Sequence, residues 1–142
     1  MNLEKYFPVN REMSNYRDRT FVGTDDEYYT ALRNSSTIYI GQLDQAINEE
    51  RLWAMFSLCG DIKRIIMGVN KKDNYFPCGF CFIEFYKIED ANKAVRCFNN
   101  VRLNDKHIKC DIDYGFIEGR QYGRGAHGGQ HRDDNIKIRK IR

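Results

Sequence analysis

The alternation of apolar and polar positions between residues 36 and 113 predicts a regular series of strands and helices. Four short stretches are rich in β-branched and aromatic residues, which is typical of strands. These predicted strands are residues 36–41 (STIYIG), 61–69 (DIKRIIMGV), 78–85 (CGFCFIEF) and 106–113 (KHIKCDID). Two stretches, residues 48–60 and 89–100, instead carry apolar residues at helical spacing. The resulting order predicts an α+β fold with a four-stranded antiparallel sheet and both helices on one face.

The same alternation assigns side chains to the two faces of the sheet. In the third strand, Cys81, Ile83 and Phe85 share a parity and are expected to point toward the helices. Three aromatic residues are then left on the uncovered face, namely Tyr39, Phe80 and Phe82. Exposed apolar surface of this kind usually marks an interaction site, which predicts a flat ligand. The alternative is that a terminal extension covers these rings as ordinary core.

The last predicted strand adds negative charge to this face. Lys109, Asp111 and Asp113 share a parity, which places two carboxylates beside the aromatic residues. A carboxylate repels phosphate but accepts hydrogen bonds from the ring N–H and the amine of guanine, at about 1.5–3 kcal/mol each. Aromatic rings hold a cationic base with roughly 0.5–2 kcal/mol. This pattern favours a cationic guanine-like ligand, although the two aspartates could instead only cap the end of the strand.

Length and composition set the remaining limits. A chain of 142 residues with 42% hydrophobic residues is expected to form one domain with extensions. No apolar run approaches the length of a membrane span, and the first residues lack the pattern of a signal peptide, so an intracellular soluble protein is expected. The five cysteines match no disulfide framework. Cys78 and Cys81 form a CxxC pair, but they should point to opposite faces of a strand, so no metal site is expected.

Nothing in the sequence indicates an enzyme. His107, His127 and His131 have no candidate nucleophile or second ligand beside them. Glu84 has no partner carboxylate in its own motif that could share acid–base chemistry. We therefore expect a binding protein that needs no cofactor.

Positive charge is concentrated in the C-terminal tail. Residues 36–113 hold eleven basic and eleven acidic side chains, whereas residues 114–142 hold seven basic and three acidic ones. Arginines among glycines suit a phosphate chain, because glycine allows close approach and arginine binds oxygens in pairs. We expect this tail and residues 1–35 to be mobile without ligand and to become ordered on binding.

The octamer CGFCFIEF and the hexamer IYIGQL resemble the two motifs of the RNA recognition motif family, in which aromatic residues stack on bases. The resemblance implies the split βαβ fold for residues 36–114. Residues 1–35 would form an N-terminal extension that contributes to the ligand site, and residues 115–142 would form a tail that folds over the ligand. Cys78 departs from the usual Lys or Arg, which removes a phosphate-binding charge.

The flanking segments carry a closer resemblance. The stretches NYRDRTF (15–21), GFIEGRQYGRG (115–125) and GGQHRD (128–133) resemble the family of small subunits of the nuclear cap-binding complex, over about residues 14–133. The resemblance implies that the protein binds the 7-methylguanosine 5′ cap of RNA polymerase II transcripts and supports splicing and export. It also implies a heterodimer with a large helical-repeat subunit, in the nucleus, with shuttling to the cytoplasm as a further expectation.

The resemblance also implies a role for each matching residue. Tyr16 and Tyr39 would sandwich the base, and Phe80 and Phe82 would form the platform. The base edge would be read by Asp111, Ile112 and Asp113. The triphosphate would be held by Lys109, Arg124, Gln130, His131 and Arg132, and Arg120 would order the tail.

Three positions depart from this family. Lys109 stands where arginine is usual, which weakens paired hydrogen bonding to phosphate, and Ile112 stands where tryptophan is usual. The residues after 133 lack the usual glycine-rich tail, which puts any function of that tail in doubt.

Two other readings stay open. The chain could be a generic single-stranded RNA-binding module of a splicing factor, or an RNA-recognition fold whose aromatic residues bind a peptide. A generic RNA binder has little use for two aspartates on its sheet. A peptide binder needs no arginine-glycine tail.

Overall fold

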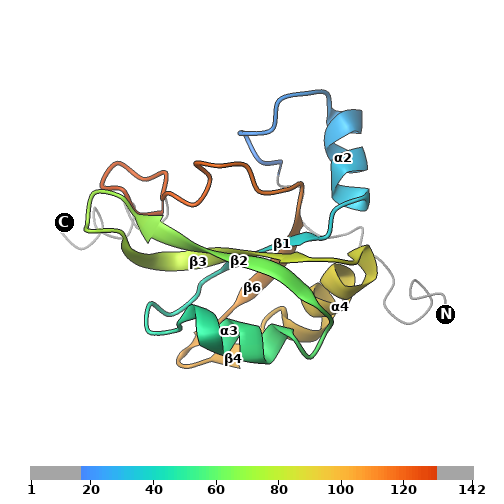
Figure 1. Cartoon of the computed structure of the whole chain (residues 1–142). Coiled ribbons are helices and arrows are strands. Elements are labelled where there is room, and N and C mark those ends of the chain that lie inside the picture. The colour runs from blue at the N-terminus through green and yellow to red at the C-terminus, as the bar shows by residue number, and fades with distance from the viewer. Residues whose placement is uncertain (1–16, 131–142) are drawn as a thin grey trace.

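The computed structural model describes residues 17–130 and contains one four-stranded antiparallel sheet (Figure 1). Its strands lie in the order β2-β3-β1-β6. The bounds of these strands are β1 Thr37–Gly41, β2 Ile62–Asn70, β3 Phe76–Phe85 and β6 Lys109–Asp113. Helix α3 (Glu49–Phe56) follows β1, and helix α4 (Ile88–Phe98) follows β3. The predicted order of strands and helices is therefore confirmed.

Two strand boundaries differ from the prediction. Strand β3 begins at Phe76, two residues before its predicted start at residue 78, because Phe76 pairs with Asn70 of β2. Strand β6 begins only at Lys109, because residues 106–107 form a separate short strand, β5. Strand β5 (Lys106–His107) pairs with β4 (Arg102–Leu103) in a small second sheet.

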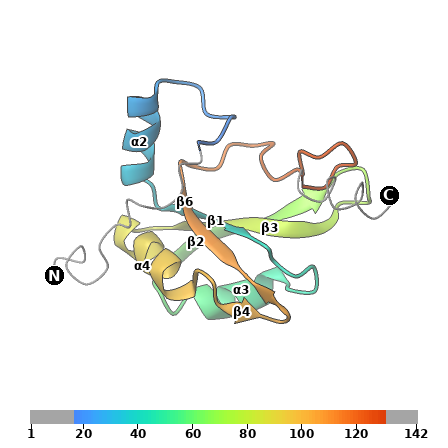
Figure 2. The ribbon, with the colours of Figure 1, turned by 180° about the vertical axis from the view of Figure 1, so that it is seen from behind.

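Both helices that follow the predicted pattern cover one face of the sheet, as the two opposite views show (Figures 1 and 2). The side chain of Asn48 caps α3 by accepting a hydrogen bond from the Arg51 amide at 2.8 Å. The core between helices and sheet includes strand residues of the predicted parity and one helical stripe from each helix. Its members include Ile38, Ile40, Cys81, Ile83, Phe85, Leu52, Phe56, Ala91, Ala94 and Val95.

A third helix, α2 (Asp25–Arg33), lies in the N-terminal segment and was not predicted. Thr24 and Glu27 form a capping box, in which the Thr24 hydroxyl accepts from the Glu27 amide at 3.1 Å. The stretch TDDE at residues 24–27 carries this signal in the sequence. The helix buries Tyr28 alone, which is too little to produce a clear apolar stripe.

The second face of the sheet carries the aromatic residues, as the parity predicted. Cys78, Phe80 and Phe82 form a cluster separate from the main core, with Tyr39 and Phe116 packed against it. Gly68 of β2 leaves room for this arrangement, since a Cβ at that position would lie 2.5 Å from the Phe80 ring. These rings are nevertheless covered, because Phe80 is 5% exposed and Phe82 is 2% exposed.

The covering layer consists of the two terminal segments of the described chain. Residues 17–33 and 114–130 lie on the side of the sheet opposite α3 and α4 (Figures 1 and 2). Phe116 packs on Phe82 with 5.5 Å between ring centroids. The alternative that a terminal extension covers the rings therefore describes Phe82 correctly.

Within residues 17–130, no helix combines the length and apolar character needed to cross a bilayer. The same part of the chain holds no cluster of three His, Cys, Asp or Glu side chains suited to a metal ion. Cys78 and Cys81 belong to the two different apolar clusters, on opposite faces of β3. The two thiols therefore lie on opposite faces of the strand, as the alternation predicted.

The fold predicts how the thiols react. Cys97 is exposed, whereas the other four cysteines are buried. Burial raises the pKa of Cys59 to about 11 and that of Cys110 to about 12, which further suppresses the reactive thiolate. A colorimetric thiol reagent should modify one cysteine rapidly in the folded protein and all five in denaturant. Cys97→Ser should remove the rapid phase, and a second rapidly reacting thiol in that variant would contradict this packing.

Candidate nucleic-acid interface

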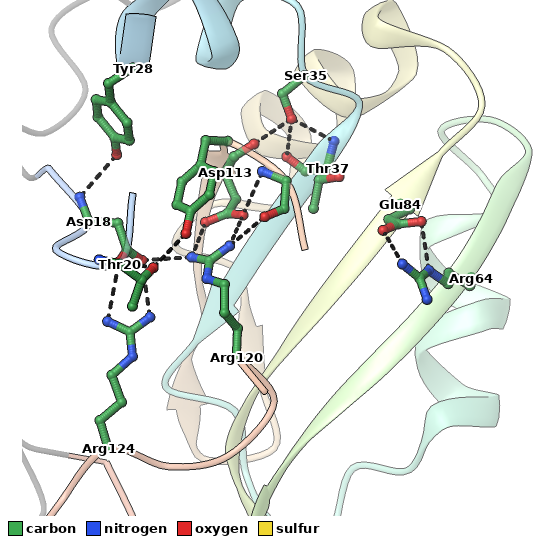
Figure 3. Close-up of polar contacts among 12 residues, drawn as sticks. Asp18, Thr20, Tyr28, Ser35, Thr37, Arg64, Glu84, Asp113, Arg120 and Arg124 are labelled. Carbon is green, nitrogen blue, oxygen red and sulfur yellow. Dashed lines mark hydrogen bonds and ion pairs between the residues drawn. The ribbon is translucent and has the colours of Figure 1, made fainter. Parts of the chain in front are cut away.

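A buried arginine lies between two aspartates on the sheet face opposite α3 and α4 (Figure 3). Arg120 donates to both carboxylate oxygens of Asp113, at 2.6 and 2.8 Å. It also donates to Asp18 at 2.6 Å, and all three side chains are at most 9% exposed. These contacts join the N-terminal segment, strand β6 and the C-terminal segment at one point.

Asp18 is held by a second arginine and by a threonine. Arg124 donates to both of its oxygens at 3.3 and 3.2 Å, and the Thr20 amide and hydroxyl donate at 2.8 and 2.7 Å. Burial alone would raise the pKa of Asp18. The hydrogen bonds from Thr20 and Arg124 and the charge of Arg120 outweigh burial, so this pKa lies well below its ordinary value. Asp18 is therefore a carboxylate at any physiological pH.

Arg120 also contacts aromatic rings. Its guanidinium carbon lies 4.2 Å from the ring centroid of Tyr114 and 4.8 Å from that of Phe82. Burial opposes its charge, but the hydrogen bond and charge of Asp113 raise its pKa above the ordinary value. Arg120 thus connects the ionic contacts to the aromatic cluster on β3.

Tyr39 lies at the other side of this cluster. Its ring stacks on Phe80 with 5.7 Å between centroids and an interplanar angle of 30°. The Tyr39 hydroxyl donates to Oε1 of Gln130 at 3.2 Å, and Nε2 of Gln130 donates to the carbonyl of Cys78 at 2.8 Å. In this structure the C-terminal segment therefore contacts the residues predicted to stack on a base.

The two aspartates of β6 have different environments. Tyr39 pairs directly with Asp111, and Thr37 pairs with Asp113. Burial raises the pKa of Asp111; a backbone hydrogen bond at Ile112 opposes this rise and the charge of Asp113 adds to it. The Asp113 carboxylate is already occupied by Arg120. The Ile112 side chain packs against the helix-side core, so only its backbone lies near the two carboxylates.

Lys109 begins β6 opposite Gly41, and its ammonium donates to the side chain of Asn100. Lys109 and Arg124 thus lie at different parts of the interface, each with a protein partner. Tyr16, His131 and Arg132, which were also predicted to bind ligand, lie outside the described residues.

Several residues of this interface were not predicted. Asp18, Tyr114 and Phe116 contact Arg120, Arg124 or the aromatic cluster, and Thr20 bonds to Asp18 and Tyr114. Asp18 lies within the NYRDRTF stretch, where it follows an arginine and looks like part of a solvated charged segment. The local sequence cannot show its main partner, because Asp18 and Arg120 are 102 residues apart.

Aromatic rings, a carboxylate and arginines gathered on one side of a sheet can bind a planar base with hydrogen-bond donors on its edge. A model of the RNA recognition motif matches residues 38–109. The solved structure titled "Structure of Rna15 RRM with bound RNA (GU)" is 26% identical with a TM-score of 0.54, over 61% of this chain and 92% of that chain. The fold and the aromatic strand face together define an RNA recognition motif protein.

Two relatives place the chain more narrowly. Nuclear cap-binding protein subunit 2 of Bombyx mori is 51% identical over 123 residues, which are 87% of this chain and 79% of that protein. The protein of the same name from Caenorhabditis elegans is 48% identical over 127 residues, which are 89% of this chain and 80% of that protein. The chain belongs to the nuclear cap-binding protein subunit 2 family.

The buried aspartate predicts a pH-dependent stability. Because the pKa of Asp18 is lower in the folded than in the unfolded chain, its stabilisation is fully present above the unfolded value. It is lost as the pH falls below about 4, toward the folded value. Asp18→Asn should lower the free energy of unfolding by about 1–3 kcal/mol at neutral pH. Denaturant unfolding at a series of pH values should show this difference shrinking below about pH 4.

Asp105→Asn is the matched control, because it removes the same charge from a side chain that is 93% exposed. This variant should stay within about 0.5 kcal/mol of the original protein. Equal effects of the two substitutions, or a deficit of Asp18→Asn that persists unchanged in acid, would exclude the buried ion pair as the cause.

Proposed function

We propose that this protein binds the 7-methylguanosine cap at the 5′ end of RNA polymerase II transcripts, as the small subunit of a nuclear cap-binding complex. The names of its relatives and its RNA recognition motif support this function. One observation of the site carries the proposal: a carboxylate, Asp111, pairs in register with Tyr39, which in turn stacks on Phe80. Acid beside aromatic rings suits a cationic guanine and does not suit a phosphate chain.

In this proposal Tyr39 stacks on one side of the methylated base and Tyr16 on the other. Methylation at N7 gives the base a positive charge, which the electron-rich rings attract with about 0.5–2 kcal/mol. Phe80 and Phe82 form the floor under Tyr39. Their burial fixes the Tyr39 ring from one side, which lowers the entropy lost on binding.

The edge of the base is read by carboxylates and backbone of β6. Asp111, the backbone at Ile112 and Asp113 lie in the segment that would accept hydrogen bonds from guanine donors. Because Arg120 already occupies the Asp113 carboxylate, Asp111 is the stronger candidate for direct contact. Its raised pKa shows that its charge is poorly solvated, so hydrogen bonds from the base would stabilise the ionised form.

The triphosphate is assigned to Lys109, Arg124, Gln130, His131 and Arg132. Arg124 and Gln130 now contact Asp18 and Tyr39, so both would exchange protein partners for phosphate oxygens when the cap binds. The Arg124 side chain is 36% exposed and can make this exchange at low cost. Arg120 would keep the C-terminal segment ordered through its buried ion pairs while Arg124 and Gln130 move.

The complete binding unit is proposed to be a heterodimer with a large helical-repeat subunit. The heterodimer would act in the nucleus in splicing and export and would shuttle to the cytoplasm with its RNA. The alternative of a generic RNA-binding module predicts no preference for a methylated base. Titration with capped ligands distinguishes these two functions.

Methylation should control affinity through the aromatic residues. Fluorescence titration of the heterodimer with methylated and unmethylated cap dinucleotides should show tighter binding of the methylated form. Tyr39→Ala should remove most of that preference and weaken the methylated ligand by roughly 5- to 150-fold, since a base stack contributes about 1–3 kcal/mol. Arg124→Ala, the matched control, should weaken both ligands by similar factors because a phosphate contact does not sense the base. Equal binding of both dinucleotides by the original protein would reject the cap proposal.

Base identity should depend on the strand carboxylate. Asp111→Asn should reduce the preference for 7-methylguanosine over the corresponding adenosine cap by at least about 10-fold, because a charged acceptor contributes about 1.5–3 kcal/mol. Competition titration with the two dinucleotides measures this ratio. Asp105→Asn should leave the ratio unchanged. A loss of affinity for both bases alike in Asp111→Asn would indicate a role in folding instead.

A further inference from the structure

Two adjacent aromatic residues at the turn between β2 and β3 are not part of the aromatic cluster described above. Tyr75 is 55% exposed and Phe76 is 59% exposed. Both belong to residues 70–76, which we call the aromatic loop. The Tyr75 ring meets Tyr122 of the C-terminal segment edge-on, with 6.4 Å between centroids. Tyr75 and Tyr122 thus form an aromatic pair, exposed Phe76 follows Tyr75 in the chain, and the proposed cap site uses none of the three.

The aromatic loop is a defined turn. The Asn70 carbonyl accepts from the amides of Asp73 at 3.1 Å and Tyr75 at 2.9 Å, and its side chain accepts from the Lys72 amide at 3.0 Å. Asn74 and Tyr75 have φ values of 51° and 58°, a left-handed conformation that suits asparagine but is uncommon for tyrosine. The turn therefore holds an aromatic side chain outward at a position where Gly or Asn would fit more easily.

The charges around these rings are mainly positive. Lys71 places its ammonium 5.1 Å from the centroid of the Tyr122 ring, and Lys72 donates to the carbonyl of Ala126 at 2.8 Å. Asp73 is the one acidic residue of the loop. Residues 121–130 of the adjoining segment contain one arginine, Arg124, one histidine and no acidic residue. Aromatic faces interleaved with cations match a single-stranded nucleic acid, in which bases alternate with phosphates.

This surface is continuous with the segment assigned to the triphosphate. The Val69 amide donates to the Gln121 carbonyl at 2.8 Å, and the Gly123 amide donates to the Val69 carbonyl at 3.1 Å. Figure 1 shows the C-terminal segment running along the β2–β3 turn, at the same end of the sheet. The aromatic loop therefore lies beside the segment that carries Arg124 and Gln130, where an RNA chain would leave the proposed triphosphate site.

We propose that the aromatic loop is a second RNA-binding site, which takes the nucleotides downstream of the cap. Tyr75 and Phe76 stack on bases, and Lys71 and Lys72 neutralise phosphates, without regard to sequence. This inference rests on the proposed cap-binding function for the origin of the RNA chain. It adds a site for the RNA chain itself, so capped RNA would bind more tightly than the cap alone.

The test compares two ligands on the assembled heterodimer: the methylated cap dinucleotide and a capped single-stranded RNA of about ten nucleotides, long enough to cover a typical single-strand site. The original protein should bind the capped RNA more tightly. The double variant Tyr75→Ala/Phe76→Ala should weaken the capped RNA at least about 5-fold and leave the dinucleotide unchanged. Tyr86→Ala is the matched control, because Tyr86 is 66% exposed and lies beyond the opposite end of β3, and it should change neither affinity.

Salt dependence tests the lysines separately. Lys71→Gln should lower the slope of log affinity against log salt for the capped RNA by about 0.7, the value for one phosphate contact with a single strand. The slope for the cap dinucleotide should not change. An unchanged slope for the capped RNA would overturn the assignment of Lys71 to phosphate.

The remaining outcomes separate this inference from the proposed function. Equal affinity of the double variant and the original protein for capped RNA would overturn the second site and leave cap binding intact. Loss of binding to the large subunit in the double variant would also overturn it, because the loop would then be a protein interface. If the original protein does not bind the dinucleotide, the cap proposal fails. Loss of uncapped RNA binding in the double variant would then still support the second site.

Discussion

The contact between Arg120 and its two aspartates determines how the terminal segments lie on the sheet. Asp113 belongs to β6, Asp18 to the N-terminal segment and Arg120 to the C-terminal segment, so one guanidinium connects all three. Burying three charges carries a large desolvation cost, which makes such a contact a weak source of net stability. Its effect is specificity, because any other placement of the segments would leave a buried charge without a partner. Phe116 reaches the aromatic cluster and Tyr114 lies against the Arg120 guanidinium as a consequence of this placement.

The sequence predicted the part of the fold that depends on local periodicity. The parity of residues along β3 placed Phe80 and Phe82 opposite the helices, because strand side chains alternate strictly and one face had to be the core. The burial of those rings could not be predicted, since it depends on Phe116, more than thirty positions away in a segment without periodicity. The capping box of α2 was readable at TDDE, but a helix that buries one tyrosine gives no amphipathic pattern.

The candidate site shows the same division. The alternation along β6 placed Asp111 and Asp113 on one face together, and the register with β1 agrees. The alternation could not distinguish Asp111 from Asp113, because the difference between the two carboxylates comes from Arg120 and from burial. Asp113 is neutralised within the protein, whereas Asp111 keeps a charge that burial disfavours. Two residues of equal parity and identical chemistry are therefore unequal as partners for a base, and only tertiary contacts make them so.

The contacts of Gln130 make ligand binding an exchange of partners. Gln130 bonds to Tyr39 and to the Cys78 carbonyl, so in the proposed binding mode a base on Tyr39 would compete with a contact of the segment assigned to the phosphates. The attachment of the same segment at Val69 is made by backbone hydrogen bonds, which a change at Gln130 need not break. Gly123 is packed so closely against the backbone of Gly128 and Gly129 that a Cβ would lie 2.3 Å from a carbonyl oxygen. The C-terminal segment is thus anchored beside the β2–β3 turn, and its contact with Tyr39 can be exchanged. The proposed binding of a cap and of its RNA chain needs both properties.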